Sequence, residues 1–304
     1  MPQLRPQPPP PPRQSVGTRI PQASDFAHLS EGPHRARSQA LHVSLVFPEV
    51  VETTTSIMLL FHGFGDSDVS FARLAKNMNL PGVLGIAVRG VEPLPPVLLA
   101  GGGEGGGGGE GVKNWMWGDD YLDGNADPGF DKARRLVLDE LVMDTLVGRL
   151  GWRTEDILLF GFGQGGSVAL GLASRLRDLE GGKRARVVDV TDETAEGKRK
   201  DAGKEEPKAF KGAISIGGPL PPSLVPTLSS REKARTPVLV CHGRGSEDVD
   251  GDAMEYIRQE IGDVREVVWS KGRIKGDDGM PRNREEMLPV MKFLAERLAA
   301  DQWS

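Results

Sequence analysis

A glycine-rich hexapeptide at residues 161–166, Gly-Phe-Gly-Gln-Gly-Gly, is the feature of this sequence that points most directly to chemistry. It follows the apolar run 156–160 and precedes apolar residues at helical spacing, which predicts a buried strand, a tight turn and a helix. Such a turn can hold a strained nucleophile, usually serine, at the top of a sheet. The central position here is Gly163, which has no side chain that could attack a carbonyl carbon.

The backbone offers a second part of such a site. Residues 62–66, His-Gly-Phe-Gly-Asp, follow the apolar run 56–61 and again form a tight loop after an expected strand. The backbone N–H groups of Phe64 and Gln164 are candidates for an oxyanion hole, which needs no catalytic side chain. Aromatic residues near such loops line ligand clefts or serve as plain hydrophobic anchors. The candidates for the cleft lining are His62, Trp115 and Trp117.

Other side chains are poorly placed to take over the nucleophile or the base. Ser167 lies four residues beyond Gly163, one turn into the expected helix, with no base nearby. Cys241 and His242 are neighbours in an expected strand, so their side chains should point to opposite faces of the sheet. His62 is expected to be structural within its loop.

Alternating strands and helices are expected around these loops. Asn283, with Glu286 three residues later, is a candidate cap for the last helix, in which Pro289 predicts a kink or a later start. The alternation predicts an α/β fold with a mostly parallel central sheet covered by helices on both faces. Strands are expected at 56–61, 83–88, 156–160, 212–216, 237–241 and 264–269, and helices over 138–150, 168–176 and 287–298.

Composition suggests where the domain begins and where it is interrupted. Residues 1–37 begin with a proline-rich tract and stay polar, which predicts a disordered tail. Residues 38–304 are expected to form one domain, since no second core is visible. Flexible inserts are expected at about 99–112, which is mostly glycine, and at 181–208, where fifteen residues are charged.

The two glycine loops together resemble those of the acyl-protein thioesterase, phospholipase and carboxylesterase family, within the α/β-hydrolase superfamily. Residues 161–166 resemble its G-F-S-Q-G-G motif except at the nucleophile, and residues 61–66 resemble its H-G-x-G-D loop. Residues 114–117 fall where the family has a W-F-D-type segment, and residues 237–243 resemble the strand that leads to its acid. The resemblance covers roughly 42 to 300, inserts excepted, and implies an α/β-hydrolase fold.

The resemblance also locates the family's catalytic triad in this sequence. Serine, acid and histidine are all missing from their expected places, and Glu247 or Asp248 could supply the acid only through a shift of the loop. No histidine follows His242. The absence of all three catalytic residues is best explained by relaxed selection on catalysis. The triad positions fall on Gly163, Ser246 and Met280.

The resemblance therefore implies a carboxylesterase- or thioesterase-like protein that has lost serine catalysis and binds an acyl-bearing small molecule or an acylated protein. The alternative is an active carboxylic ester or thioester hydrolase, of palmitoyl-protein hydrolase, lysophospholipase or carboxylesterase type, with a rearranged site. That site would use Ser167 or Ser246 with His242. A third hypothesis places the function in partner binding by the proline-rich tail and the charged insert. No metal or organic cofactor is implied.

Composition limits the partners further. The net charge of −5 provides no basic surface for nucleic acid or for an anionic membrane. The single cysteine, Cys241, excludes an internal disulfide framework, and no apolar run is long enough to span a bilayer. We expect a cytoplasmic protein without an integral membrane segment. The tract Pro8–Pro12 is a candidate ligand for an aromatic groove on a partner.

Overall fold

The computed structural model describes residues 18–30, 40–95, 114–119, 127–177, 208–226, 232–269 and 272–299. Nearly all of both expected inserts lies outside these ranges, as do residues 1–17 and 31–37 of the expected tail. The described residues form one sheet with helices on both faces, together with a small two-stranded ribbon. This architecture confirms the expected α/β class with a mostly parallel sheet.

The central sheet has seven strands in the order β1-β3-β2-β6-β7-β8-β9. Only β1 runs antiparallel to its neighbour, and the other pairs are parallel. Their carboxyl ends therefore meet at one edge, where loops from several strands can share a site. The strands are β1 (Val43–Val46), β2 (Ser56–Phe61), β3 (Val83–Val88), β6 (Ile157–Phe162), β7 (Gly212–Ile216), β8 (Val238–Gly243) and β9 (Val264–Trp269), with β4 (Glu92–Pro93) and β5 (Trp115–Met116) in the ribbon.

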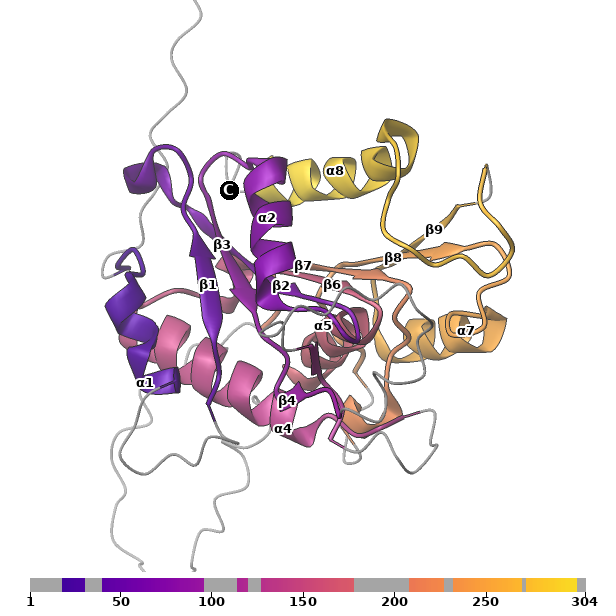
Figure 1. Ribbon diagram of the computed structural model, residues 1–304, viewed down its shortest axis with the longest axis horizontal. Coiled ribbons are helices and arrows are strands. Elements are labelled where there is room, and N and C mark those ends of the chain that lie inside the picture. The colour runs from indigo at the N-terminus through magenta and orange to yellow at the C-terminus, as the bar shows by residue number, and fades with distance from the viewer. Residues whose placement is uncertain are drawn as a thin grey trace, which may run out of the picture.

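Helices cover the sheet on both sides (Figure 1). On one face α2 and α8 pack over one hydrophobic cluster, and on the other α1, α4, η4, α5 and α7 contribute to a second cluster. None of the helices in the described ranges is long and apolar enough to cross a membrane. The helices are η1 (Ala23–Phe26), α1 (Ala27–Ser30), η3 (Val51–Thr53), α2 (Asp68–Met78), α4 (Asp131–Arg134), η4 (Arg135–Arg149), η5 (Thr154–Asp156), α5 (Gln164–Arg175), η6 (Pro222–Leu224), α7 (Gly251–Glu260) and α8 (Arg284–Ala299).

The sequence predicted the strands closely. The bounds of β2, β3, β7 and β9 are those expected, while β6 and β8 each begin one residue later and end two residues later than expected. The extensions are paired, since Phe162 lies opposite Ile216 and Gly243 lies opposite Trp269. Strand pairing therefore carries β6 and β8 directly into the loops of the site.

The helix expected over 138–150 is present but begins earlier and is wound more widely. Residues 135–149 form a π-helix that continues α4, and the Leu150 N–H donates to the Thr145 carbonyl, five residues back, at 3.1 Å. Its buried side chains recur at steps of five, as at Leu136, Leu141 and Leu146. This wider turn lets an almost continuous apolar stripe face the sheet.

The last helix begins where its cap predicts. The Asn283 side chain accepts a hydrogen bond from the Glu286 N–H at 3.0 Å, while the Glu286 carboxylate accepts from the Arg282 N–H at 2.8 Å. The predicted cap is therefore confirmed. The later start suggested by Pro289 is wrong, because α8 begins at Arg284 and contains the proline.

Residues 18–30 correct the expected disordered tail. They form η1 and α1, and they bury Phe26 and Leu29 in the core cluster on the α4 side of the sheet. The Trp152 indole N–H donates to the Arg19 carbonyl at 3.0 Å, which fastens the segment to the domain. Two well-placed apolar side chains are enough to anchor a stretch whose average composition is polar.

Candidate functional site

The elbow is retained at the junction of β6 and α5. Gly163 has φ 51° and ψ −123°, a conformation that costs a residue with a side chain free energy. Its N–H donates to the Ile216 carbonyl at 2.8 Å, and the Ser167 N–H donates to the Gly163 carbonyl at 3.1 Å. The strained turn of a nucleophile elbow is thus present although its apex residue has no side chain.

The space around the elbow is closed at its flanks and open at its apex. A Cβ atom at Gly161 would lie 2.0 Å from the Gly165 carbonyl oxygen, and one at Gly165 would lie 2.2 Å from the Phe61 carbonyl oxygen. At Gly163 the nearest heavy atom to such a Cβ would be the Gly63 Cα, at 3.9 Å. A Cβ atom would therefore meet no collision at the apex, where the resemblance puts the nucleophile, although the positive φ strains any residue other than glycine.

His62 holds the neighbouring loop and is closed to ligands. Its ring is fully buried, its Nδ1 donates to the Gly63 carbonyl at 2.7 Å, and its Nε2 accepts from the Gly90 N–H at 2.8 Å. Burial lowers the pKa of this imidazole, which favours the neutral form. With both ring nitrogens occupied, His62 is structural, and its assignment to the cleft lining is corrected.

The two tryptophans differ in role. Trp117 is fully buried, its indole N–H donates to the His62 carbonyl at 2.8 Å, and its ring packs on Phe61, so it is an anchor rather than a cleft wall. Trp115 is half-buried at the rim, under the guanidinium of Arg89 at 5.1 Å from its ring centroid. Of the three proposed lining residues, only Trp115 is open to a ligand in this structure.

The structure brings the two oxyanion-hole candidates into adjoining segments. Gln164 opens α5, and the loop containing Phe64 lies against the start of that helix, at the Phe61 and His62 carbonyl oxygens. The Gln164 Oε1 accepts from the Trp117 N–H at 3.1 Å. The Phe64 side chain is 39% exposed, a large apolar group left at the rim. The oxyanion role of the two backbone N–H groups stays a prediction.

At the acid position the Ser246 hydroxyl is hydrogen-bonded to a carboxylate. That carboxylate belongs to Asp278, which the sequence did not indicate as a site residue. Ser246 is buried, and its Oγ donates to Asp278 Oδ2 at 2.6 Å. Asp278 Oδ1 also accepts from the Gly243 N–H at 2.6 Å. Counting back along the helix pointed to Met280, which instead packs at the cluster under α2 and α8. Only the folded loop shows that Asp278 is the residue that reaches the acid position.

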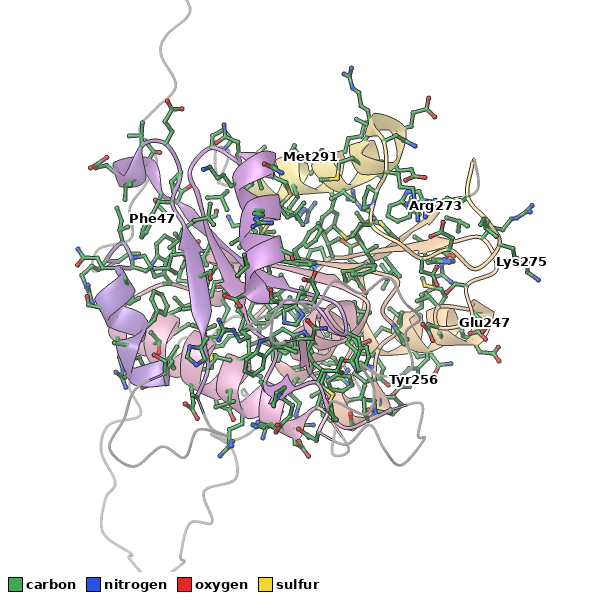
Figure 2. The ribbon with its side chains drawn as sticks, viewed as in Figure 1. Phe47, Glu247, Tyr256, Arg273, Lys275 and Met291 are labelled. Carbon is green, nitrogen blue, oxygen red and sulfur yellow. The ribbon has the colours of Figure 1, made fainter. Side chains whose placement is uncertain are left out.

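The neighbouring acidic residues do not restore a triad. Partial desolvation by the surrounding loop, together with the charges of Asp278 and Glu247, raises the pKa of Asp248. The side chains of Glu247 and Asp248 nevertheless remain accessible to solvent, and Figure 2 shows Glu247 at the surface near α7. No histidine in the described ranges is hydrogen-bonded to either carboxylate.

A buried arginine fixes the loop that contains Asp278. The Arg273 side chain is 1% exposed, stacks 4.5 Å from the Trp269 ring centroid and forms an ion pair with Glu286 at 2.7 Å. The ion pair holds the pKa of Glu286 at about 2. Arg273 also donates to the Gly279 and Met280 carbonyls at 2.7 and 2.8 Å, and Figure 2 shows it at the β9 end of the molecule. The loop is therefore held in one conformation from within.

The Cys241–His242 pair is separated, as its alternating strand positions predicted. Cys241 packs in the cluster under α2 and α8, where burial raises its pKa to about 12. His242 instead contacts Glu266 on β9, with Nε2 3.0 Å from Oε1, and its Nδ1 lies 3.1 Å from the Gly243 carbonyl oxygen. The ring is therefore occupied away from the elbow and cannot serve Ser167, which is buried in α5.

The other histidines are remote or lie outside the described ranges. His28 contacts the Thr145 hydroxyl at 3.1 Å, His42 precedes β1, and His34 lies outside those ranges. Within the described part of the chain, no group of three His, Cys, Asp or Glu side chains is arranged to hold a metal ion. The site thus consists of backbone loops, an open apex and the Ser246–Asp278 pair.

Comparison with known proteins finds a family model that matches the part of the chain containing these loops. Residues 45–185 match the model of a family described as phospholipase/carboxylesterase. The match contains both glycine loops, so it confirms the resemblance seen in the motifs. In family and fold, the chain resembles carboxylesterase- and thioesterase-like hydrolases.

Two fungal proteins are similar over part of their length. An uncharacterized hydrolase of Schizosaccharomyces pombe is 37% identical over 123 residues, which are 38% of this chain and 44% of that protein. An uncharacterized hydrolase of Mycosarcoma maydis is 30% identical over 128 residues, which are 38% of this chain and 40% of that protein. The chain thus matches less than half the length of these curated relatives.

Solved structures share the fold at low identity. The esterase PE8 has a TM-score of 0.56 at 19% identity, covering 84% of this chain and 98% of its own. Acyl-protein thioesterase 2 of Zea mays has a TM-score of 0.52 at 18% identity, covering 84% of this chain and 99% of its own. Both support the α/β-hydrolase fold.

Proposed function

Because this α/β-hydrolase-fold chain matches the phospholipase/carboxylesterase family over residues 45–185, we propose that it binds acyl groups without the family's serine catalysis. The observation that carries this proposal is the retained elbow with Gly163 at its apex. Glycine adopts this backbone conformation at little cost, so the turn keeps the shape of a nucleophile elbow without the serine. Its retention supports continued use of the cleft for binding.

The missing catalytic partners, as well as the missing serine, support the proposed loss of catalysis. A serine hydrolase needs a base within hydrogen-bond reach of the nucleophile and an acid that orients the base. His62 and His242 have their ring nitrogens occupied by other groups. The Ser246–Asp278 pair supplies a hydroxyl and a carboxylate where the family has an acid and an imidazole.

The ligand that fits the remaining groups is an acyl-bearing small molecule or an acylated protein. The open apex leaves room for a carbonyl group, and the exposed Phe64 ring with half-buried Trp115 provides an apolar rim for a chain. The acidic net charge and single buried cysteine support a cytoplasmic setting. The proline-rich segment before residue 18 remains a candidate for a separate partner.

The test measures catalysis and binding on the same preparations. The natural protein and a Gly163→Ser variant are assayed with p-nitrophenyl butyrate, an octanoyl thioester and a fluorophosphonate label. We expect both proteins to hydrolyse at the background rate and to stay unlabelled, because neither has a base. Stabilisation of the natural protein by an acyl ligand in a thermal melt supports the binding role. Turnover with labelling of the natural protein would refute the proposal.

The second candidate, an active hydrolase with a rearranged site, rests on one contact. The Ser246 hydroxyl donates to Asp278 at 2.6 Å, which is a hydroxyl paired with a potential base. Under this hypothesis a fluorophosphonate labels the natural protein, and Ser246→Ala abolishes both labelling and turnover. A matched Ser167→Ala variant should then retain both, because its side chain is buried within α5.

A further inference from the structure

One short segment, residues 115–117, joins the two parts of the backbone that border the open apex. The backbone of Trp115 pairs with the loop 62–66, accepting a hydrogen bond at 2.9 Å and donating one at 3.0 Å. Two residues later, the Trp117 N–H donates to the Gln164 Oε1 at 3.1 Å. The loop 62–66 approaches the apex from one side, and Gln164 follows it directly. A shift of residues 115–117 would therefore move the loop relative to the start of α5.

This segment has little support from its own strands. β4 and β5 are each two residues long, and a two-stranded ribbon is marginally stable at best in water. Side chains must therefore hold it. Lys132 forms an ion pair with Glu92 on β4, and Trp117 is fully buried. At Trp115 the side-chain contact is with Arg89.

Arg89 is oriented by a buried carboxylate. Its guanidinium carbon lies 5.1 Å from the Trp115 ring centroid, within the range of a cation–π contact. Its Nε donates to Asp68 Oδ1 at 2.9 Å, while Asp68 Oδ2 accepts from the Ser44 hydroxyl at 2.6 Å. The Asp68 side chain is 3% exposed. A planar guanidinium that is hydrogen-bonded in this way keeps a fixed orientation over the ring.

The contacts form a chain from Asp68 through Arg89 and Trp115 to the loop at the apex. Resting on the proposed acyl-binding function, we infer that Arg89 is a positioning residue for recognition of the acyl carbonyl. It holds the Trp115 ring, and residues 115–117 hold the loop 62–66 near Gln164. Loss of the guanidinium releases the ring and lets the two segments shift. Affinity for a carbonyl group should then fall, whereas affinity for an alkyl chain should not.

The experiment measures carbonyl recognition as a ratio of two affinities. Methyl hexanoate and methyl hexyl ether have the same chain length, and only the ester has a carbonyl group. Dissociation constants for both probes come from isothermal titration calorimetry with the full-length protein, and thermal melts are recorded in parallel. Hydrogen bonding to the carbonyl predicts that the natural protein binds the ester about tenfold more tightly than the ether. General destabilisation would weaken both probes alike, so the ratio isolates positioning.

Three variants test the residue. Arg89→Gln should reduce the ratio to about twofold or less, because the carbonyl loses its hydrogen bonds. Arg89→Lys keeps a cation near Asp68 and the ring, so its ratio should lie above that of Arg89→Gln. Arg73→Gln, which removes an exposed cation from α2, should keep the ratio of the natural protein.

The outcomes separate this inference from the function on which it rests. If neither probe binds the natural protein, the acyl-binding function fails and the inference fails with it. If the natural protein binds both probes equally, or if Arg89→Gln keeps the full ratio, the binding function stands and the positioning role is refuted. If Arg89→Gln does not fold, Trp115→Leu decides, since it removes the other half of the contact. A reduced ratio in that variant supports the inference, and an unchanged ratio overturns it.

Discussion

Replacing Gly163 by alanine tests whether the elbow is held in its strained conformation without a nucleophile. At φ 51° and ψ −123° a side chain raises the backbone energy, while the nearest heavy atom to the new Cβ would be 3.9 Å away. Steric collision therefore adds nothing, and the cost is conformational. Such a backbone costs about 1–3 kcal/mol for a residue other than glycine. We expect Gly163→Ala to lower the unfolding free energy by about 2 kcal/mol, or about 4–8 °C in Tm.

Two further glycines provide the matched controls. Gly251 opens α7 with no neighbour within 4 Å of a new Cβ, so Gly251→Ala should stabilise the protein by about 0.4–1 kcal/mol. Gly165→Ala would place its Cβ 2.2 Å from the Phe61 carbonyl oxygen and should destabilise more than Gly163→Ala. The assay is urea unfolding followed by circular dichroism. If Gly163→Ala is as stable as the natural protein, the elbow is relaxed and its retention cannot support a binding role.

Three other predictions concern the surroundings of the site. Leu29→Ala should lower the unfolding free energy by about 2–5 kcal/mol in urea, because the Leu29 side chain is fully buried. Deletion of residues 1–17 should leave Tm unchanged. Equal effects of the two changes would contradict the packing of α1. The Glu286 pKa is lowered from 4.5 to about 2, so the ion pair with Arg273 stabilises the fold above pH 4.5 and is lost as the pH falls toward 2. The difference in unfolding free energy between the natural protein and Glu286→Gln should therefore shrink over that range. A difference that does not change with pH would disprove the linkage. Burial raises the Cys241 pKa to about 12, so iodoacetamide should modify it at pH 8 only after denaturant is added, and rapid native alkylation would show that β8 is open.

Periodic burial made the framework predictable from the sequence. The runs at β2, β3 and β7 are short, apolar and bounded by turn residues, and parallel strands covered on both faces require that pattern. The elbow was predictable for a steric reason, because Gly161 and Gly165 stand where a Cβ would meet backbone oxygens. Local sequence encodes both features.

Features that depend on loop conformation and on few contacts were not predictable. The Ser246–Asp278 hydrogen bond joins residues thirty-two apart through a loop whose path depends on the buried Arg273. Counting along the chain therefore pointed to Met280. Residues 18–30 were misjudged because two buried side chains outweigh a polar average, and the wide turn of η4 became visible only in its hydrogen bonds.

The charged insert expected at 181–208 is attached at the edge of the sheet opposite the elbow. Arg177, the last described residue before it, donates to the Glu260 carbonyl at 3.1 Å, at the end of α7. Lys211, just after it, donates through its N–H to the carbonyl of Ile157, the first residue of β6, at 2.9 Å. Both attachment points therefore lie one full strand length away from Gly163. A tag, a dye or a different linker between these points could therefore be attached far from the elbow.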